Sequence, residues 1–272
     1  MTDFLRRRAS LLLIAAALAA GVVAWQVDRG RLAKITLEPT RVVTVKKVRE
    51  ASGLAWWPSR GHLLTVADSG VVAEITLDGD LVRERRFPGL DFEDVALIDD
   101  HRAWIVDEQQ HLLVMLRLDD FELGERHTLP VISPAKGTNR MFEGIALDRA
   151  TGRILLAHES HPAALVTLEA DGITPGHTSV VDAPSVSGVE LSPDGKDALL
   201  VSNQGYLLLM GDGGRTLAGE ARTSWRRIEG CALVPGVGLV TCVDANESKL
   251  LVFGQLATWD AIRSTLAGRK SR

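Results

Sequence analysis

The chain has 272 residues, of which 46% are hydrophobic and 24% charged, so it is long enough and apolar enough to form one large globular core. Its formal charge is −4, but six of the 31 basic residues and only two of the 35 acidic ones lie in residues 1–34, which leaves a net charge of −8 on the remainder. Because nucleic-acid binding needs clustered cations that displace counterions from phosphates, this acidic body argues against nucleic acid as a partner.

The first predicted element is a membrane anchor. An apolar run from Ala9 to Val27 follows three arginines and is interrupted only by Ser10 and Gln26. Nineteen residues are just enough for a helix to cross a hydrocarbon core of about 30 Å. The alternative is a cleaved signal peptide, since the run contains a small-residue cleavage pattern at 17–19. Its continuation to Trp25, a suitable interfacial anchor, favours an uncleaved helix.

The orientation of this anchor is predicted from the lengths of its flanks. Basic residues on both sides nearly balance, so the positive-inside rule does not decide. A short N-terminal tail favours a cytoplasmic N-terminus with the larger domain translocated. We therefore expect residues 1–34 to form a cytoplasmic tail, an anchor in the bacterial inner membrane and a linker, and residues 35–272 to form a periplasmic domain.

From residue 51 onward one short pattern recurs five times. A Ser or Glu is followed by Gly or Asp and then by mostly apolar residues, in the segments Ser52-Gly53-Leu54-Ala55, Glu93-Asp94-Val95-Ala96, Glu143-Gly144-Ile145-Ala146, Ser187-Gly188-Val189-Glu190 and Glu229-Gly230-Cys231-Ala232. The Gly or Asp positions are spaced by 41, 50, 44 and 42 residues. A four-stranded propeller blade takes about 40 to 45 residues, so the repeat predicts an all-β, five-bladed β-propeller.

Each copy continues as short apolar runs separated by Gly, Pro and Asp, which is typical of antiparallel strands. The fifth copy lacks room for a fourth strand after Leu250 to Phe253, whereas Arg41 to Val48 is strand-like and unassigned. We therefore expect the N-terminal strand to complete the fifth blade and to cover its edge. A helix is expected only in the anchor and in about the last fifteen residues.

These repeats resemble the SdiA-regulated, YjiK-like family of bacterial envelope proteins from about Lys46 to Phe253. The segments that carry the resemblance are Glu50-Ala51-Ser52-Gly53-Leu54-Ala55, Phe92-Glu93-Asp94-Val95-Ala96, Asn139-Arg140-Met141-Phe142-Glu143-Gly144-Ile145-Ala146 and Ser187-Gly188-Val189. The resemblance implies an N-terminal membrane segment, a five-bladed propeller distantly similar to NHL repeats, and a calcium site. It implies no particular enzymatic activity.

The same repeat predicts an acidic ring at one end of the propeller axis. The innermost strands line the axis, so Glu93, Glu143 and Glu229 should converge there, and pairing within hairpins places Asp68, Asp107 and Asp244 beside this ring. The same pairing leaves Glu143 near either His158 or Glu159, and Ser187 near either Ser202 or Asn203. Converging carboxylates must bind a cation or take up protons, and a set of hard oxygen ligands favours Ca²⁺. The alternative is a solvated rim around a wide channel.

Two functions remain open at this stage. The sequence lacks the G-x-S-x-G, phosphate-loop and H-E-x-x-H motifs, which favours a calcium-binding module for a small ligand or an envelope protein. The alternative is a metal-dependent lactonase or phosphoesterase similar to gluconolactonase. In that enzyme the axial ion would polarise the substrate and activate water.

The two cysteines give one further expectation. Cys231 and Cys242 fall opposite each other if Leu233 and Val234 pair back across a turn from Pro235 to Gly238, and an oxidising compartment would permit a disulfide. The alternative is a pair of buried free thiols.

Overall fold

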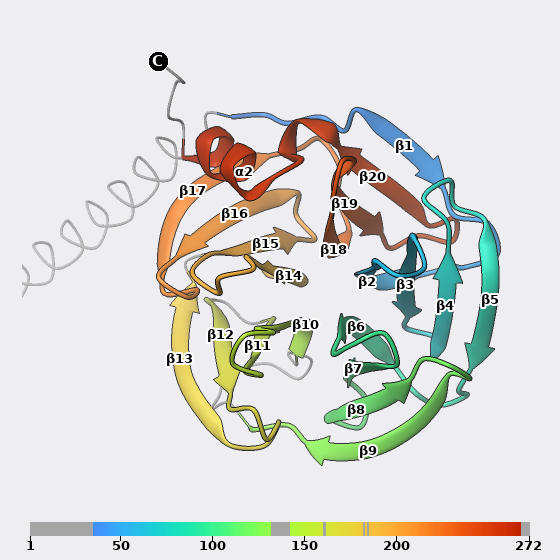
Figure 1. Ribbon diagram of the computed structural model, residues 1–272. Helices are drawn as coiled ribbons and strands as arrows, with labels where there is room; N and C mark the ends of the chain where they lie inside the picture. The colour runs from blue at the N-terminus through green and yellow to red at the C-terminus, as the bar shows by residue number, and fades with distance from the viewer. Residues whose placement is uncertain (1–34, 132–141, 160–161, 182, 184, 268–272) are drawn as a thin grey trace, which may run out of the picture.

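A computed structural model describes residues 35–131, 142–159, 162–181, 183 and 185–267. Five four-stranded antiparallel sheets are arranged around a central axis, as Figure 1 shows, so the predicted five-bladed propeller is confirmed. In the first four blades the strands run outward in chain order. These strands are β2 (Ala51–Trp57), β3 (His62–Ala67), β4 (Val71–Ile75) and β5 (Leu81–Arg86); β6 (Phe92–Leu97), β7 (Arg102–Asp107), β8 (Leu112–Arg117) and β9 (Glu122–Thr128); β10 (Phe142–Leu147), β11 (Ile154–His158), β12 (Ala163–Leu168) and β13 (Pro175–Val181); and β14 (Gly188–Leu191), β15 (Ala198–Ser202), β16 (Tyr206–Gly211) and β17 (Thr216–Arg222).

The fifth blade joins the two ends of the propeller. It consists of β18 (Ile228–Val234), β19 (Gly238–Val243), β20 (Lys249–Phe253) and, outermost, β1 (Arg41–Thr44). β1 pairs with β20 in the register Val42↔Leu251, and the adjacent Val45 N–H donates to the Ser248 carbonyl at 2.8 Å. The predicted closure by the N-terminal strand is therefore confirmed.

The burial of each strand follows its distance from the axis. In the second strand of blade one, five of six residues are buried and four of the six are apolar, because both of its faces are covered. The outermost strand of the same blade, LVRERR, alternates half-buried and exposed residues. The core consists of five clusters of apolar side chains, one at each interface between adjacent blades.

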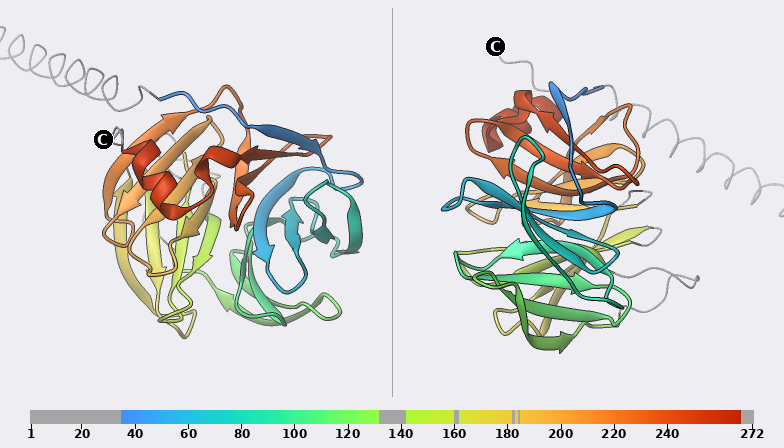
Figure 2. Two further views of the ribbon diagram at one scale, coloured as in Figure 1. Left: turned by 45° about the horizontal axis from the view of Figure 1, so that its top comes forward. Right: turned by 90° about the vertical axis from the view of Figure 1, so that its right-hand side faces the viewer.

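The C-terminal segment covers the outer side of blades four and five (Figures 1 and 2). It comprises η1 (Gly254–Leu256) and α2 (Trp259–Leu266), whose N-cap Thr258 accepts a hydrogen bond from Ala261 N–H at 3.1 Å. Trp259, Ile262 and Leu266 are buried in the cluster between these blades. The short predicted C-terminal helix is thus present and seals one blade interface.

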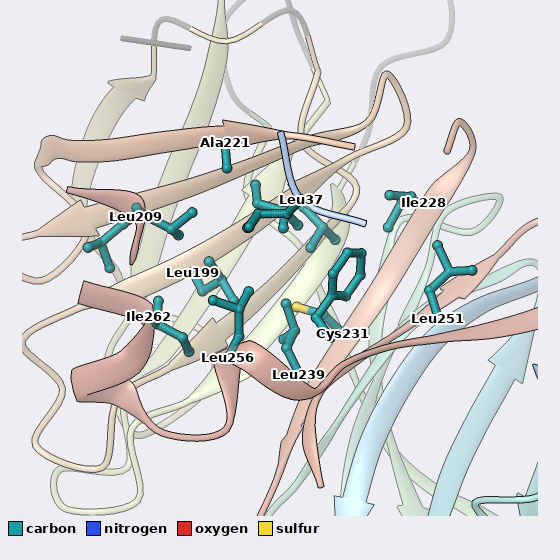
Figure 3. Close-up of a cluster of buried hydrophobic side chains, with 14 of the residues drawn as sticks. Leu37, Leu199, Leu209, Ala221, Ile228, Cys231, Leu239, Leu251, Leu256 and Ile262 are labelled. Atoms are coloured by element: carbon teal, nitrogen blue, oxygen red, sulfur yellow. The ribbon is translucent and has the colours of Figure 1, made fainter. Parts of the chain in front are cut away.

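The predicted disulfide between Cys231 and Cys242 is wrong, because both thiols are free and buried. Gly238 pairs with Val234, so the turn is one residue shorter than predicted and Cys231 lies opposite Thr241. Adjacent positions of a strand point to opposite faces, and each thiol therefore joins a different core cluster. Figure 3 shows Cys231 among Leu239, Leu251 and their neighbours between blades four and five.

The predicted membrane anchor, residues 9–27, lies outside the described residues. Among the residues that are described, no helix is long and apolar enough to cross a membrane.

Candidate functional site

The acids of the repeat lie where the innermost strands are irregular. In blades one, two, three and five the pairing between the first two strands shifts at the start of the inner strand, and Ser52, Glu93, Glu143 and Glu229 fall within these shifts. In blade four, Ser187 directly precedes β14. Such bulges re-aim side chains, and here they direct the repeated Ser or Glu toward the end of the axis.

A second ring surrounds the first and is formed by the residue that follows the second strand of each blade. Its members are Asp68, Glu108, Glu159, Asn203 and Asp244. The sequence left Glu143 beside either His158 or Glu159, and Ser187 beside either Ser202 or Asn203. The structure places Glu159 and Asn203 at the axis.

One predicted site residue lies elsewhere. Asp107 is the last residue of β7 and pairs with Phe92, and its Oδ1 accepts a hydrogen bond from Gln110 N–H at 3.1 Å. It is fully buried and is absent from the axial cavity, where the next residue, Glu108, stands instead. The bulge between Phe92 and Val95 accounts for this error of one position.

The two rings enclose a polar cavity of about 170 Å³. It is lined by seven carboxyl groups, one hydroxyl and one amide, from Ser52, Asp68, Glu93, Glu108, Glu143, Glu159, Asn203, Glu229 and Asp244. Five of the six acids that the sequence proposed are in this set. Liquid water occupies about 30 Å³ per molecule, so the cavity has room for an ion together with a few waters.

Few cations or donors offset the carboxylates of this cavity. Among the described residues, a single ion pair reaches a lining acid, from Arg227 to Asp244 at 3.5 Å. Asn203 Nδ2 donates to Glu159 Oε1 at 3.0 Å, and the Ser52 hydroxyl donates to Asp68. The site therefore carries a strong excess of acidic groups over groups that would neutralise them.

Burial and mutual repulsion raise the pKa values of these acids. For Glu93, burial is the largest cause and the neighbouring Glu143 the second, and its pKa lies well above the usual range of a glutamate. Burial likewise raises the pKa of Glu143 and of Glu229 well above their usual range. The pKa of Asp68 is raised to about 6, mainly by burial. Without a cation, the inner carboxyls therefore hold protons at neutral pH.

At one side of the cavity three acids are close enough to share an ion. Carboxylate oxygens of Asp68, Asp91 and Glu93 lie within 4.8 Å of one another. Oxygen donors of this kind in this number suit Ca²⁺, which takes six to eight oxygen ligands in flexible geometry. The donor set offers no cysteine and no histidine, so it does not suit zinc.

Directly beyond the acids, backbone packs on backbone across the axis. A Cβ atom on Gly53 would lie 2.5 Å from Asp94 Cα, and one on Gly230 would lie 2.4 Å from Leu54 N. Asp94, the one acid at the glycine position, is buried, and its Oδ2 accepts Ile145 N–H of blade three at 2.9 Å. This layer is the floor of the acidic cavity and explains why the repeat needs glycine.

The sequence did not propose Glu108 or Asp91 as site residues, and it offered Glu159 and Asn203 only as alternatives to His158 and Ser202. The available signal was the glycine near the start of the inner strand in four of the five blades, since glycine within a strand often marks a bulge. A bulge assigned to blade two by analogy would have moved its second-ring residue from Asp107 to Glu108.

Comparisons with known proteins agree with this architecture. The SdiA-regulated family matches residues 28–237. The chain belongs to the SdiA-regulated family. No curated protein matches it.

Two solved structures show how this member compares in fold. Myxococcus xanthus glutaminyl cyclase has a TM-score of 0.64 at 14% sequence identity, over 80% of this chain and 95% of that one. Kuenenia stuttgartiensis hydrazine synthase has a TM-score of 0.47 at 10% identity, over 73% of this chain and 57% of that one. The likeness to the cyclase extends to the fold alone.

Proposed function

We propose that this member of the SdiA-regulated family is a membrane-anchored, periplasmic calcium-binding propeller that presents its acidic end to a small ligand or an envelope protein. The observation that carries the calcium proposal is the ring of seven carboxyl groups around a 170 Å³ cavity. Buried like charges at this density require protons or a cation. Glu93, Glu143 and Glu229 would hold the ion, with Asp68 and Asp244 ligating directly or through water.

Titration calorimetry of the full-length protein in lipid nanodiscs, stripped of divalent ions, tests this proposal. We expect one Ca²⁺ to bind per chain, and Glu143→Gln to weaken binding at least tenfold, since a ligand charge is removed. Glu125→Gln is the matched control, because Glu125 is exposed on an outermost strand. Absence of Ca²⁺ binding at millimolar concentration would show that the acids form a protonated or solvated rim.

The size of the cavity favours a binding module over the metal-dependent hydrolase. Sites that enclose an organic molecule usually measure about 300–1,000 Å³, so the 170 Å³ cavity suits an ion better than the enclosed substrate of a hydrolase, and a ligand or partner would contact its rim. A screen against lactones and phosphoesters, with and without Ca²⁺, separates the two functions. Calcium-dependent turnover that is lost in Glu143→Gln would establish the hydrolase instead.

The location is proposed from the apolar run at residues 9–27 and the short tail before it. A C-terminal alkaline phosphatase fusion should be active in bacterial cells and should fractionate with the inner membrane. An inactive fusion would place the propeller in the cytoplasm, whereas a soluble periplasmic fusion would establish cleavage of the segment.

A further inference from the structure

A second cavity lies at the opposite end of the propeller axis. It measures about 410 Å³ and is lined by residues from the innermost strands of all five blades, with Pro58, Pro193 and Pro235 in the turns that follow. It shares no lining residue with the acidic cavity. The layer of close backbone contacts around Gly53 and Gly230 separates the two, so each end of the axis is a distinct compartment.

Most of the residues that line this second cavity have apolar side chains. The inner strands contribute leucine, valine, isoleucine and alanine side chains, together with the half-buried Trp56. Its volume lies within the range of about 300–1,000 Å³ that is typical of pockets for small organic molecules. The apolar walls therefore suit the hydrocarbon body of a small ligand.

One acid interrupts this apolar wall, and its position in the repeat is informative. Two residues after the repeated Gly or Asp, four blades carry alanine, at Ala55, Ala96, Ala146 and Ala232, and all four are buried. Blade four alone carries a glutamate, Glu190. The fold therefore accepts alanine at this position, and nothing in the propeller architecture requires a carboxylate there.

The Glu190 carboxylate has no hydrogen-bond or ion-pair partner within the described part of the chain. Burial raises its pKa to about 8, and the positive charge of Arg149 partly opposes that effect. Arg149 is exposed at the mouth of the cavity, and Asp94 and Cys231 are the other titratable groups nearby. Glu190 is half-buried, and an unpartnered carboxylate beside apolar side chains is costly, so a bound donor would be favoured.

From this geometry we infer that the second axial cavity binds a small organic ammonium ion, whose N–H groups donate to Glu190 and whose apolar body contacts the inner strands. An ammonium ion stabilises the ionised form of Glu190, which burial alone disfavours, whereas a neutral donor does not. Arg149 at the mouth disfavours a second positive charge at the far end of the ligand. A monoammonium with an alkyl or aryl body therefore fits better than a polyamine.

The test compares three probes of similar shape and different charge: 2-phenylethylammonium, 2-phenylethanol and 3-phenylpropanoate. Binding is measured by calorimetry on the full-length protein in nanodiscs, with empty nanodiscs as the blank and Ca²⁺ present throughout. We expect the ammonium to bind at least tenfold more tightly than either other probe. Glu190→Ala should remove that preference and leave the weak binding of the alcohol unchanged, because the apolar walls remain.

Glu190→Ala is a suitable variant because it restores the residue that four blades already carry, so its melting temperature should equal or exceed that of the wild type. Glu190→Gln keeps the size of the side chain and should also lose the preference for the ammonium. The inference is overturned if none of the probes binds at about 10 mM, which corresponds to a free energy too small for a built site. It is equally overturned if Glu190→Ala binds the ammonium as tightly as the wild type. Neither result bears on Ca²⁺ binding at the other end.

Discussion

The raised pKa values at the acidic end predict that removing divalent ions reverses the usual effect of pH on stability. In the metal-free protein Glu93, Glu143 and Glu229 keep their protons in the folded state, because burial disfavours the charged form. In the unfolded chain they ionise near pH 4.5, the ordinary value for glutamate. Above that pH the folded state binds more protons than the unfolded state, so stability falls as pH rises toward the folded pKa values.

The size of the effect follows from linkage. Each carboxyl that is protonated in the folded state and ionised in the unfolded state lowers the free energy of unfolding by about 1.4 kcal/mol per pH unit. At about 2–4 °C per kcal/mol for a domain of this size, even one such group lowers the melting temperature by roughly 3–5 °C per pH unit. Bound Ca²⁺ replaces the protons, so this slope should largely disappear when the ion saturates the site.

The assay is thermal unfolding of the full-length protein from pH 6 to pH 9, stripped of divalent ions or saturated with Ca²⁺. We expect the stripped protein to lose stability as pH rises, and the Ca²⁺-loaded protein to change much less. Glu93→Gln should reduce the slope of the stripped protein by the contribution of one group, whereas Glu125→Gln should leave it unchanged. Parallel curves for the two preparations would refute the reasoning, since they would mean that the acids ionise freely in water.

Three further predictions concern the propeller itself. Gly230→Ala should lower the free energy of unfolding, measured by chemical denaturation, by at least about 1–3 kcal/mol, because the added Cβ would lie 2.4 Å from backbone of blade one. Gly124→Ala is the control and should lower it far less, because its Cβ would closely approach only the flexible end of a methionine. Glu74→Gln should lower the free energy of unfolding by about 3–5 kcal/mol, because Glu74 is fully buried with ion pairs to Arg60, His62 and Arg83. The pKa of Glu74 is lowered to about 2 in the folded state. The stabilisation by its ionised carboxylate is therefore present above pH 4.5 and is lost as pH falls toward 2. The difference in stability between the wild type and Glu74→Gln should therefore shrink between pH 4.5 and pH 2, and a constant difference would contradict this prediction. Val45→Pro removes the donor to Ser248 beside the closing strand and should make β1 exchange its amide hydrogens faster than β20 does; unchanged exchange would show that closure does not depend on this bond.

The repeat in the sequence was sufficient to predict the blades and their closure. Five copies of a Ser/Glu-Gly/Asp pattern at blade-length spacing predict five sheets. Blade five lacked a fourth strand, so another part of the chain had to supply one. Both predictions depend only on the order of the strands along the chain, so an error of one residue in strand pairing does not change them.

Register itself could not be predicted, and both errors came from it. A turn one residue shorter than predicted placed Cys231 opposite Thr241 and so put the two thiols on different faces, and the bulge near Phe92 exchanged Asp107 for Glu108. A bulge depends on how five inner strands pack around one axis, since Gly53 and Gly230 approach each other closely across blades. A single hairpin considered alone carries no information on that packing.

The central claim is that the acidic end of the axis holds one calcium ion, and the anomalous scattering of a Ca²⁺-soaked crystal tests it most directly. We predict one strong peak on the axis, at about 2.3–2.6 Å from carboxylate oxygens of Glu93, Glu143 and Glu229. An axial cavity without a peak, in crystals that contain millimolar Ca²⁺, would contradict the claim.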